Sequence, residues 1–184
     1  MRVNKSLALL WYNESTERGE DKMILAQFDK MNCGGFAFGV TQWVNVTKDR
    51  DSYRLLARSP SNLYPMACDM KRYIPVEYRI ITAQELVAPD EYRVAFRMGK
   101  NDFHFMREVP SGVWVDKRGN ESFIEAHSEK YVLNAMNWYE DYGGRTVLLA
   151  VKKGADYDEW ISEIEECLDK HDGNIEDMMF VRGL

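Results

Sequence analysis

The run Val109-Pro110-Ser111-Gly112-Val113 is the feature that most constrains the fold of this 184-residue chain. Pro110 suits the second position of a type I turn, and Gly112 suits the left-handed position that completes a three-residue hairpin loop. Val109 then lies opposite Val113, and every later pair along the two arms follows from that pair. The sequence therefore predicts a β-hairpin with a defined register.

Apolar and polar residues alternate in the segments beside this loop, as they do in strands with one buried face. Farther along the chain, an acidic amphipathic pattern predicts a helix. The predicted strands are 78–81, 92–98, 102–109, 113–116 and 145–151, and the predicted helices are 33 to 44 or 46, 64–72 and 156–170. Residues 121–139 have helical spacing that is interrupted at His127-Ser128. A helix, then antiparallel strands, then terminal helices indicate an α+β fold, and we expect 1–184 to form one domain.

Composition excludes several classes of protein. A hydrophobic content of 45% and five tryptophans favour a folded globule, and a net charge of −6 gives no electrostatic case for binding nucleic acid or an anionic membrane. No apolar run approaches the roughly 18 residues of a membrane span, and the run 7–12 is too short for a signal peptide. The three cysteines are widely spaced, which favours a reducing compartment, and we expect a cytoplasmic protein.

Cys33 lies where a loop is expected to become a helix. Asn32 is a suitable N-cap, because its side-chain oxygen can accept a hydrogen bond from a backbone N–H of the first turn. In that first turn the helix dipole favours a thiolate. Gly34 and Gly35 are poor helix formers, and we expect that they keep the sulfur approachable.

His104 is the best candidate for a base among the three histidines. His127 and His171 lie in polar segments, and we interpret them as having no part in catalysis. In the register set by Gly112, His104 and Asp116 share a face and form a diagonal pair about 7–8 Å apart, which the two side chains can bridge. A four-residue loop would place Asp116 on the other face.

A thiol, an imidazole and a carboxylate can act as nucleophile, base and orienting group. The order Cys33, His104, Asp116 resembles that of the papain-like cysteine hydrolases, most closely their compact NlpC-type branch. Asn-Cys-x-x-Phe-Ala and Phe-His-Phe…Gly-Val-Trp-Val-Asp-Lys-Arg-Gly are also similar to motifs of uncharacterised bacterial and phage proteins of this kind. The resemblance covers Gln27 to Asn120.

The resemblance implies a papain-like fold, in which the Cys begins a helix packed on a sheet and the His and a polar third residue lie on adjacent strands. The third residue is often His in that branch and Asn in papain relatives, so Asp116 is a permitted variant. Gln27 precedes Cys33 by six residues, the offset of the oxyanion glutamine in papain relatives. Tyr12 is the alternative oxyanion donor.

The expected activity is hydrolysis of a peptide or amide bond in a protein or peptide substrate, without a cofactor. Peptidase, glutamine deamidase and transglutaminase activities share this chemistry. The alternative from another class is a non-enzymatic binding or inhibitor module on a papain-like scaffold, which a buried and unreactive Cys33 would favour. A metal site that uses Cys33 and His104 lacks a close ligand pair and is disfavoured.

Overall fold

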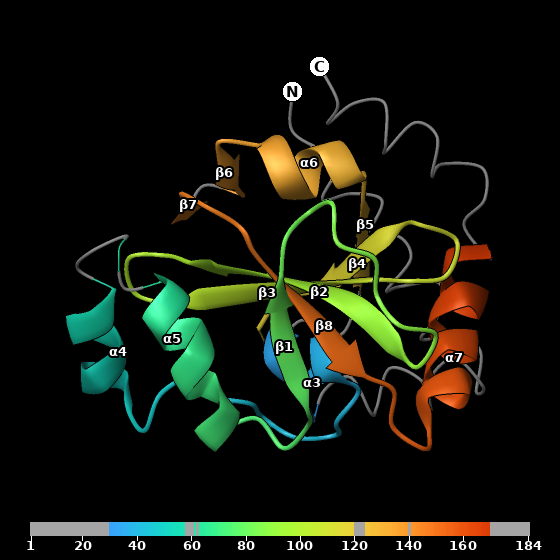
Figure 1. Ribbon diagram of the computed structural model, residues 1–184, viewed down its shortest axis with the longest axis horizontal. Helices are drawn as coiled ribbons and strands as arrows, with labels where there is room; N and C mark the ends of the chain where they lie inside the picture. Colours follow the sequence, from blue (N-terminus) through green and yellow to red (C-terminus); the bar gives the residue numbers. More distant parts are fainter. Residues whose placement is uncertain (1–29, 58–60, 62, 120–123, 140, 170–184) are drawn as a thin grey trace, which may run out of the picture.

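The computed structural model describes residues 30–57, 61, 63–119, 124–139 and 141–169. The fold is α+β, and its centre is a six-stranded sheet in the order β1-β8-β2-β3-β4-β5, in which all neighbours are antiparallel (Figure 1). The strands are β1 (Tyr78–Ile81), β2 (Glu91–Met98), β3 (Phe103–Glu108), β4 (Trp114–Lys117), β5 (Ile124–His127) and β8 (Val147–Lys152). The antiparallel α+β architecture predicted from the sequence is confirmed.

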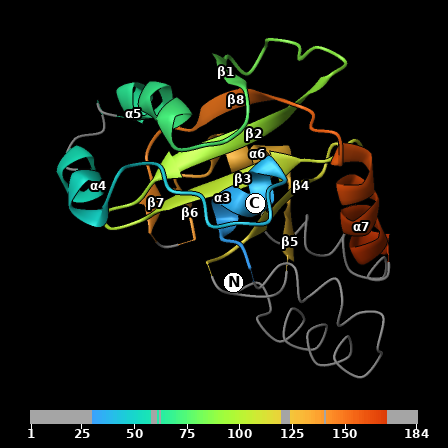
Figure 2. The same ribbon diagram turned by 90° about the horizontal axis from the view of Figure 1, so that it is seen from below.

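Helices and a small hairpin cover the sheet. The helices are α3 (Cys33–Phe38), α4 (Arg50–Leu56), α5 (Leu63–Asp69), the 3₁₀ helix η2 (Met70–Arg72), α6 (Glu129–Asn134) and α7 (Tyr157–Asp169), and β6 (Asn137–Trp138) pairs with β7 (Tyr142–Gly143). In Figure 1, α6 and β6 lie on one side of the sheet, and α3 and α5 lie on the other. Figure 2 shows α7 beside β4, and the two share one apolar cluster. Within the described segments, no helix has the length and apolar character needed to cross a bilayer.

The predicted hairpin is present with its predicted register. The Val109 N–H donates to the Val113 carbonyl over 2.9 Å, and Gly112 adopts a left-handed φ of 83°. Glu108 lies opposite Trp114 in the ladder. The predicted faces of β3 and β4 are therefore correct.

The prediction that the Cys33 helix extends to residue 44 or 46 is wrong, because α3 ends at Phe38. Gly39 adopts a left-handed φ of 67° as the C-cap, and this conformation ends the helix. Val44 is buried, but it packs from the loop that follows α3 and does not belong to the helix. The apolar residues that suggested one long helix therefore belong partly to the short helix α3 and partly to the loop that folds back over it.

The helical spacing over 121–139, interrupted at His127-Ser128, corresponds to a helix only after the interruption. The described part of this stretch contains β5, then α6, then β6. The Ser128 hydroxyl accepts a hydrogen bond from the Tyr131 N–H at 3.2 Å and is the N-cap of α6. The residues just before Ser128 are therefore free to form a strand, and His127 is the last residue of that strand.

The core lies on both faces of the sheet. Successive side chains of β3 point to opposite faces of the sheet. Phe105 packs in a cluster with α3 and α5, and Met106 packs in a cluster with α6 and Trp138. His104 and Met106 are two residues apart on β3 and therefore point to the same face of the sheet, the face covered by α6. Cys33 belongs to the cluster on the opposite face.

Candidate active site

Asn32 fixes the backbone at the start of α3. Its side-chain oxygen accepts hydrogen bonds from the Gly35 N–H and the Val44 N–H, both at 3.0 Å, and its amide donates to the Val44 carbonyl at 2.8 Å. Asn32 is thus the predicted N-cap, and it also ties the returning loop to the helix. From the sheet, the buried Lys117 ammonium donates to the Met31 carbonyl at 2.8 Å.

The expectation that Gly34 and Gly35 expose the sulfur is wrong, because both glycines are buried. A Cβ on Gly34 would lie 3.0 Å from the Val44 Cβ, and one on Gly35 would collide with the Gln42 carbonyl oxygen. These glycines allow the loop after α3 to pack directly on the helix. They serve close packing around Cys33 and do not provide access to it.

The predicted contact between His104 and Asp116 is confirmed. The Nε2 of His104 hydrogen-bonds to the Oδ2 of Asp116, and both side chains are buried. The carboxylate can only accept, so the proton of this bond lies on Nε2. Nδ1 is then the ring nitrogen that remains for exchange of a proton with a thiol.

Cys33 approaches this pair from the other face of the sheet, near the first residues of β3. Its sulfur lies 3.8 Å from the carbonyl oxygen of Phe103, the residue that precedes His104. The Cys33 side chain also raises the pKa of the His104 ring, which reflects the short distance between the two side chains. The three predicted catalytic residues are therefore brought together, although Cys33 is only 5% exposed.

Charge interactions stabilise the imidazolium form of His104. Burial lowers the pKa of this ring, but the Asp116 carboxylate and the Cys33 side chain outweigh burial and raise it to about 10. For Asp116, burial favours the neutral acid, yet interactions with His127 and His104 hold its pKa well below the usual value. The pair is therefore an ion pair over the neutral pH range.

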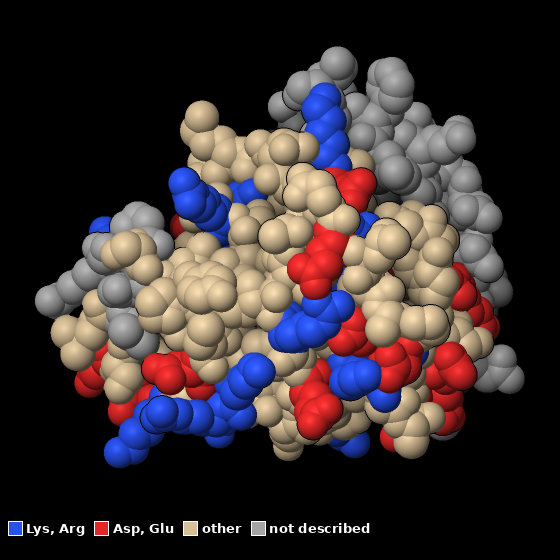
Figure 3. Space-filling view, viewed as in Figure 1, with Lys and Arg blue, Asp and Glu red and all other residues tan. Residues whose placement is uncertain are grey.

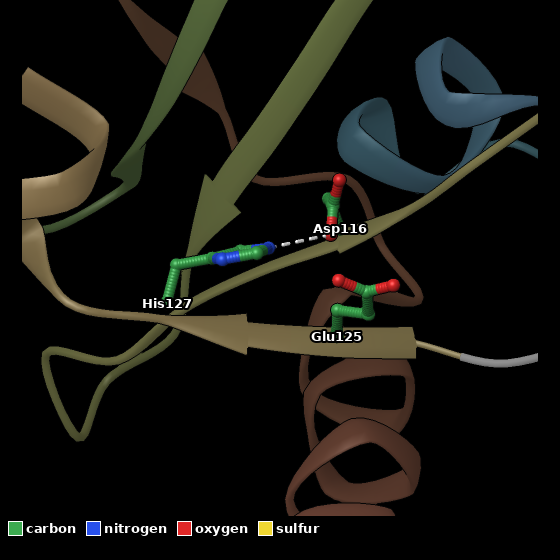
Figure 4. Close-up of side chains that lie close together, drawn as sticks. All are labelled: Asp116, Glu125 and His127. Atoms are coloured by element: carbon green, nitrogen blue, oxygen red, sulfur yellow. Dashed lines mark hydrogen bonds and ion pairs between the residues drawn. The ribbon is translucent and has the colours of Figure 1, made fainter. Parts of the chain in front are cut away.

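His127 is the site residue that the sequence analysis missed. It is 2% exposed, lies at the end of β5, and places its Nε2 2.8 Å from Asp116 Oδ1 (Figure 4). Ladder pairing puts Trp114 opposite His127 and Glu125 opposite Asp116, so the histidine is a diagonal neighbour of the carboxylate. Ser128 can cap the start of a helix, which indicates that the residues before it are not helical and can form a strand. The helical spacing over 121–139 obscured this signal.

The hairpin of β6 and β7 surrounds the His104 ring with aromatic side chains. The ring centroid of His104 lies 6.2 Å from that of Trp138, 5.5 Å from that of Tyr139 and 5.1 Å from that of Tyr142. The Tyr139 hydroxyl donates to Asp116, and burial raises the pKa of Tyr139, so it stays protonated as a donor. The hairpin thus touches both His104 and its carboxylate.

Asp116, Glu125 and His127 also form a set of potential metal ligands, since their ligand atoms lie within 4.8 Å of one another. The Tyr139 hydroxyl lies among them, 2.7 Å from Asp116 Oδ2, 3.2 Å from His127 Nε2 and 3.3 Å from Glu125 Oε2. The Arg118 guanidinium, 2.8 Å from Glu125, already supplies a positive charge. These contacts satisfy the ligand atoms within the protein, so the set does not fit a metal ion.

The other sequence candidates have separate positions. Gln27 and Tyr12, the candidate oxyanion donors, lie outside the described residues, as does His171. Two further carboxylates lie in or beside the strand of His104: Asp102 is exposed and accepts from the Phe103 N–H at 2.8 Å, and the Glu108 carboxylate lies 2.6 Å from Arg93. Neither carboxylate replaces Asp116 as the hydrogen-bond partner of His104.

Comparison with protein-family models found no match for the chain, and comparisons with curated proteins and with solved structures found no significant match. The function proposed below therefore rests on the geometry of Cys33, His104 and Asp116.

Proposed function

We propose that this chain is a cysteine hydrolase of the papain-like, NlpC-type kind, which cleaves a peptide or amide bond with Cys33, His104 and Asp116. The observation that carries the proposal is the position of His104, which is hydrogen-bonded to Asp116 and directly follows Phe103, whose carbonyl oxygen lies 3.8 Å from the Cys33 sulfur. A nucleophile, an imidazole and an orienting carboxylate in contact are the groups that acyl transfer through a thiol requires.

In the first half of the reaction, Cys33 is the nucleophile. With the thiol proton on Nδ1 of His104, the thiolate attacks the carbonyl carbon, a C–S bond forms, and the carbonyl electrons move onto oxygen. As the tetrahedral intermediate collapses, the C–N bond breaks and the His104 imidazolium gives its Nδ1 proton to the departing amine. Asp116 accepts a hydrogen bond from the Nε2–H throughout, so Nδ1 remains the nitrogen that exchanges protons.

In the second half, water releases the acyl group. The neutral His104 takes a proton from water through Nδ1, and the resulting hydroxide oxygen attacks the thioester carbon. The C–S bond breaks and the thiolate leaves, with the imidazolium beside it. The balance is one amide and one water converted to one acid and one amine.

A polypeptide is the proposed substrate. Figure 3 shows Lys/Arg and Asp/Glu side chains near one another over the lower part of the described face, with no continuous field of one sign. The whole chain carries a net charge of −6, which disfavours polyanions as substrates. Within this class we place peptide-bond cleavage ahead of glutamine deamidation, and the same thioester could also pass to an amine.

The test is incubation of the wild-type chain and of Cys33→Ala with a mixed peptide library, followed by mass spectrometry. New peptide termini that depend on Cys33 support a peptidase. A gain of about one dalton on Gln without new termini supports a deamidase. If neither product forms, and a peptidyl vinyl sulfone does not modify Cys33, the hydrolase proposal is wrong.

The burial of Cys33 favours one second candidate, a non-enzymatic binding module on the same scaffold. A thiol that is 5% exposed has the burial expected of a small core residue. This candidate predicts that Cys33→Ser keeps the fold and whatever binding the module performs. The same vinyl sulfone experiment separates the two, because an unreactive core thiol is not modified in the native chain.

A further inference from the structure

We infer that His127 and Tyr139 are positioning residues, which hold the Asp116 carboxylate in the orientation that engages His104. The inference rests on the proposed function for its catalytic meaning. It concerns two residues from different parts of the chain, one at the end of β5 and one just after β6.

Both oxygens of Asp116 are held by neighbouring side chains. Oδ2 hydrogen-bonds to His104 Nε2 and lies 2.7 Å from the Tyr139 hydroxyl, while Oδ1 lies 2.8 Å from His127 Nε2 and 3.0 Å from the same hydroxyl. A carboxylate with donors on both oxygens cannot rotate about its terminal bond without breaking hydrogen bonds. His127 and Tyr139 therefore fix which oxygen faces His104.

The contacts of His127 indicate a role directed at Asp116. The polar contacts of Nε2 are with Asp116 and the Tyr139 hydroxyl, and Nδ1 has no hydrogen-bond partner among the described residues. Its ring stacks on Tyr131 at a centroid distance of 4.9 Å, which sets the plane of the imidazole. A histidine needed only to fill space in the core would have no reason to present a donor to a buried carboxylate.

The backbone at Tyr139 supports the same role. Tyr139 has a φ of 54°, and it is the one non-glycine residue of the described chain with a positive φ. A bulky side chain is rarely found in this left-handed region, and such conformations concentrate at functional sites. Here the conformation carries the phenol to Asp116 and places its ring centroid 5.5 Å from that of His104.

The groups that face the His104–Asp116 pair come from every element packed around it. They are Cys33 from α3, the buried Arg97 opposite His104 on β2, Arg118 just after β4, Glu125 and His127 from β5, Tyr139, and Tyr142 from β7. Glu125 is balanced by its ion pair with Arg118, so it does not compete with Asp116 for His104. Among these groups, only His127 and Tyr139 donate to Asp116 besides His104 itself.

The inference can be tested on the full chain by following the His104 imidazole with ¹H–¹⁵N NMR as the pH is raised. Three histidines make the assignment simple. The variants are Tyr139→Phe, which removes only the hydroxyl, and His127→Leu, which removes the donor. His127→Gln is the conservative variant, because its amide can place an N–H near the former Nε2. Tyr78→Phe is the matched control, since that buried hydroxyl donates to the Ala67 carbonyl away from the site.

We expect the His104 titration to move down by about one pH unit or more in Tyr139→Phe and in His127→Leu, because a loose carboxylate stabilises the imidazolium less well. His127→Gln should recover most of the wild-type value, and Tyr78→Phe should leave it unchanged. Identical titration of His104 in all variants, with folding intact by circular dichroism, would overturn the inference.

A second readout keeps this inference separate from the proposed function. The rate of Cys33 alkylation near pH 6 reports on the proposed function, because it requires a reactive thiolate, whereas the His104 titration reports on how Asp116 is held. If Cys33 is unreactive in the wild type while the His104 titration still depends on Tyr139 and His127, the hydrolase proposal fails and the positioning inference stands. If Cys33 is reactive and the titration does not depend on them, the reverse holds.

Discussion

Asp116 and His127 lie diagonally across the β4–β5 ladder, and the histidine Nε2 is 2.8 Å from the carboxylate oxygen that His104 does not use. Asp116 thus bridges two histidines. The arrangement leaves the carboxylate ionised in a fully buried position, where an isolated charge would be costly. One consequence is that substitutions at Asp116 should differ sharply from those at other carboxylates near His104.

Asp116→Asn should lower turnover by about 10²–10⁴-fold, because an amide can present its N–H to His104 Nε2 and so favour the wrong tautomer. Asp102→Asn is the matched control, since this exposed carboxylate caps the Phe103 N–H and does not bond to His104. It should change turnover by no more than about twofold. The measurement is the Cys33-dependent product of the peptide library, with circular dichroism to verify folding. A larger loss in Asp102→Asn would contradict the assignment of Asp116.

The dependence of stability on pH should have two limbs. The pKa of Asp116 is depressed below its ordinary 3.8 by His127 and His104 despite burial, so its contribution is present above that value and is lost as the pH falls below it. The pKa of His104 is raised from 6.5 to about 10 by Asp116 and Cys33 despite burial, so its contribution is complete below pH 6.5 and is lost as the pH rises toward 10.

Thermal unfolding of the wild type and of Asp116→Asn from pH 3 to pH 10 measures both limbs. The difference in Tm between them should be greatest between about pH 4 and 6.5 and should shrink on either side. Asp90→Asn is the control, because its exposed carboxylate pairs with Lys152 at the surface and should give only a small change. A difference in Tm that is constant over the whole range would contradict the coupling of Asp116 with His104.

The packing around Cys33 gives a prediction about stability alone. Gly35→Ala should destabilise the fold by about 1–3 kcal/mol, because the new methyl group would collide with the Gln42 carbonyl oxygen and lie 2.8 Å from the Met31 Cβ. Gly154→Ala is the matched control, with nothing within 4 Å of the added Cβ. Denaturant unfolding of both variants checks the result. Equal stabilities would mean that the loop after α3 does not pack on the helix as described.

Much of the sheet could be predicted because its signals are local. Alternation along 92–98 and the turn residues Pro110 and Gly112 define strand faces and register without knowledge of the rest of the chain. For this reason the contact between His104 and Asp116 could be predicted across the hairpin. The His104–Asp116 contact follows from the length of the hairpin loop and from the alternation of side chains between the two faces of each strand.

The errors arose where tertiary packing decides the structure. Gly39 ends α3, and the apolar Val44 packs on Gly34 from a returning loop, a contact that helical spacing cannot distinguish from a continued helix. His127 was missed because it ends a strand of only four residues. The pairing of that strand with β4, which brings His127 to Asp116, has no local signal in the sequence. Tyr139 has no local signal at all, since its role depends on a left-handed backbone conformation.

The most direct test of the central claim is the order in which the cysteines react. Iodoacetamide at limiting dose near pH 6 should modify Cys33 before Cys68 and Cys167, although Cys68 is exposed and Cys33 is buried. The expected cause is thiolate formation beside the His104 imidazolium, so His104→Ala should slow the modification of Cys33 and leave that of Cys68 unchanged. Peptide mapping by mass spectrometry gives the order. Preferential modification of Cys68 with Cys33 untouched, in the folded wild type, would contradict an activated nucleophile at Cys33.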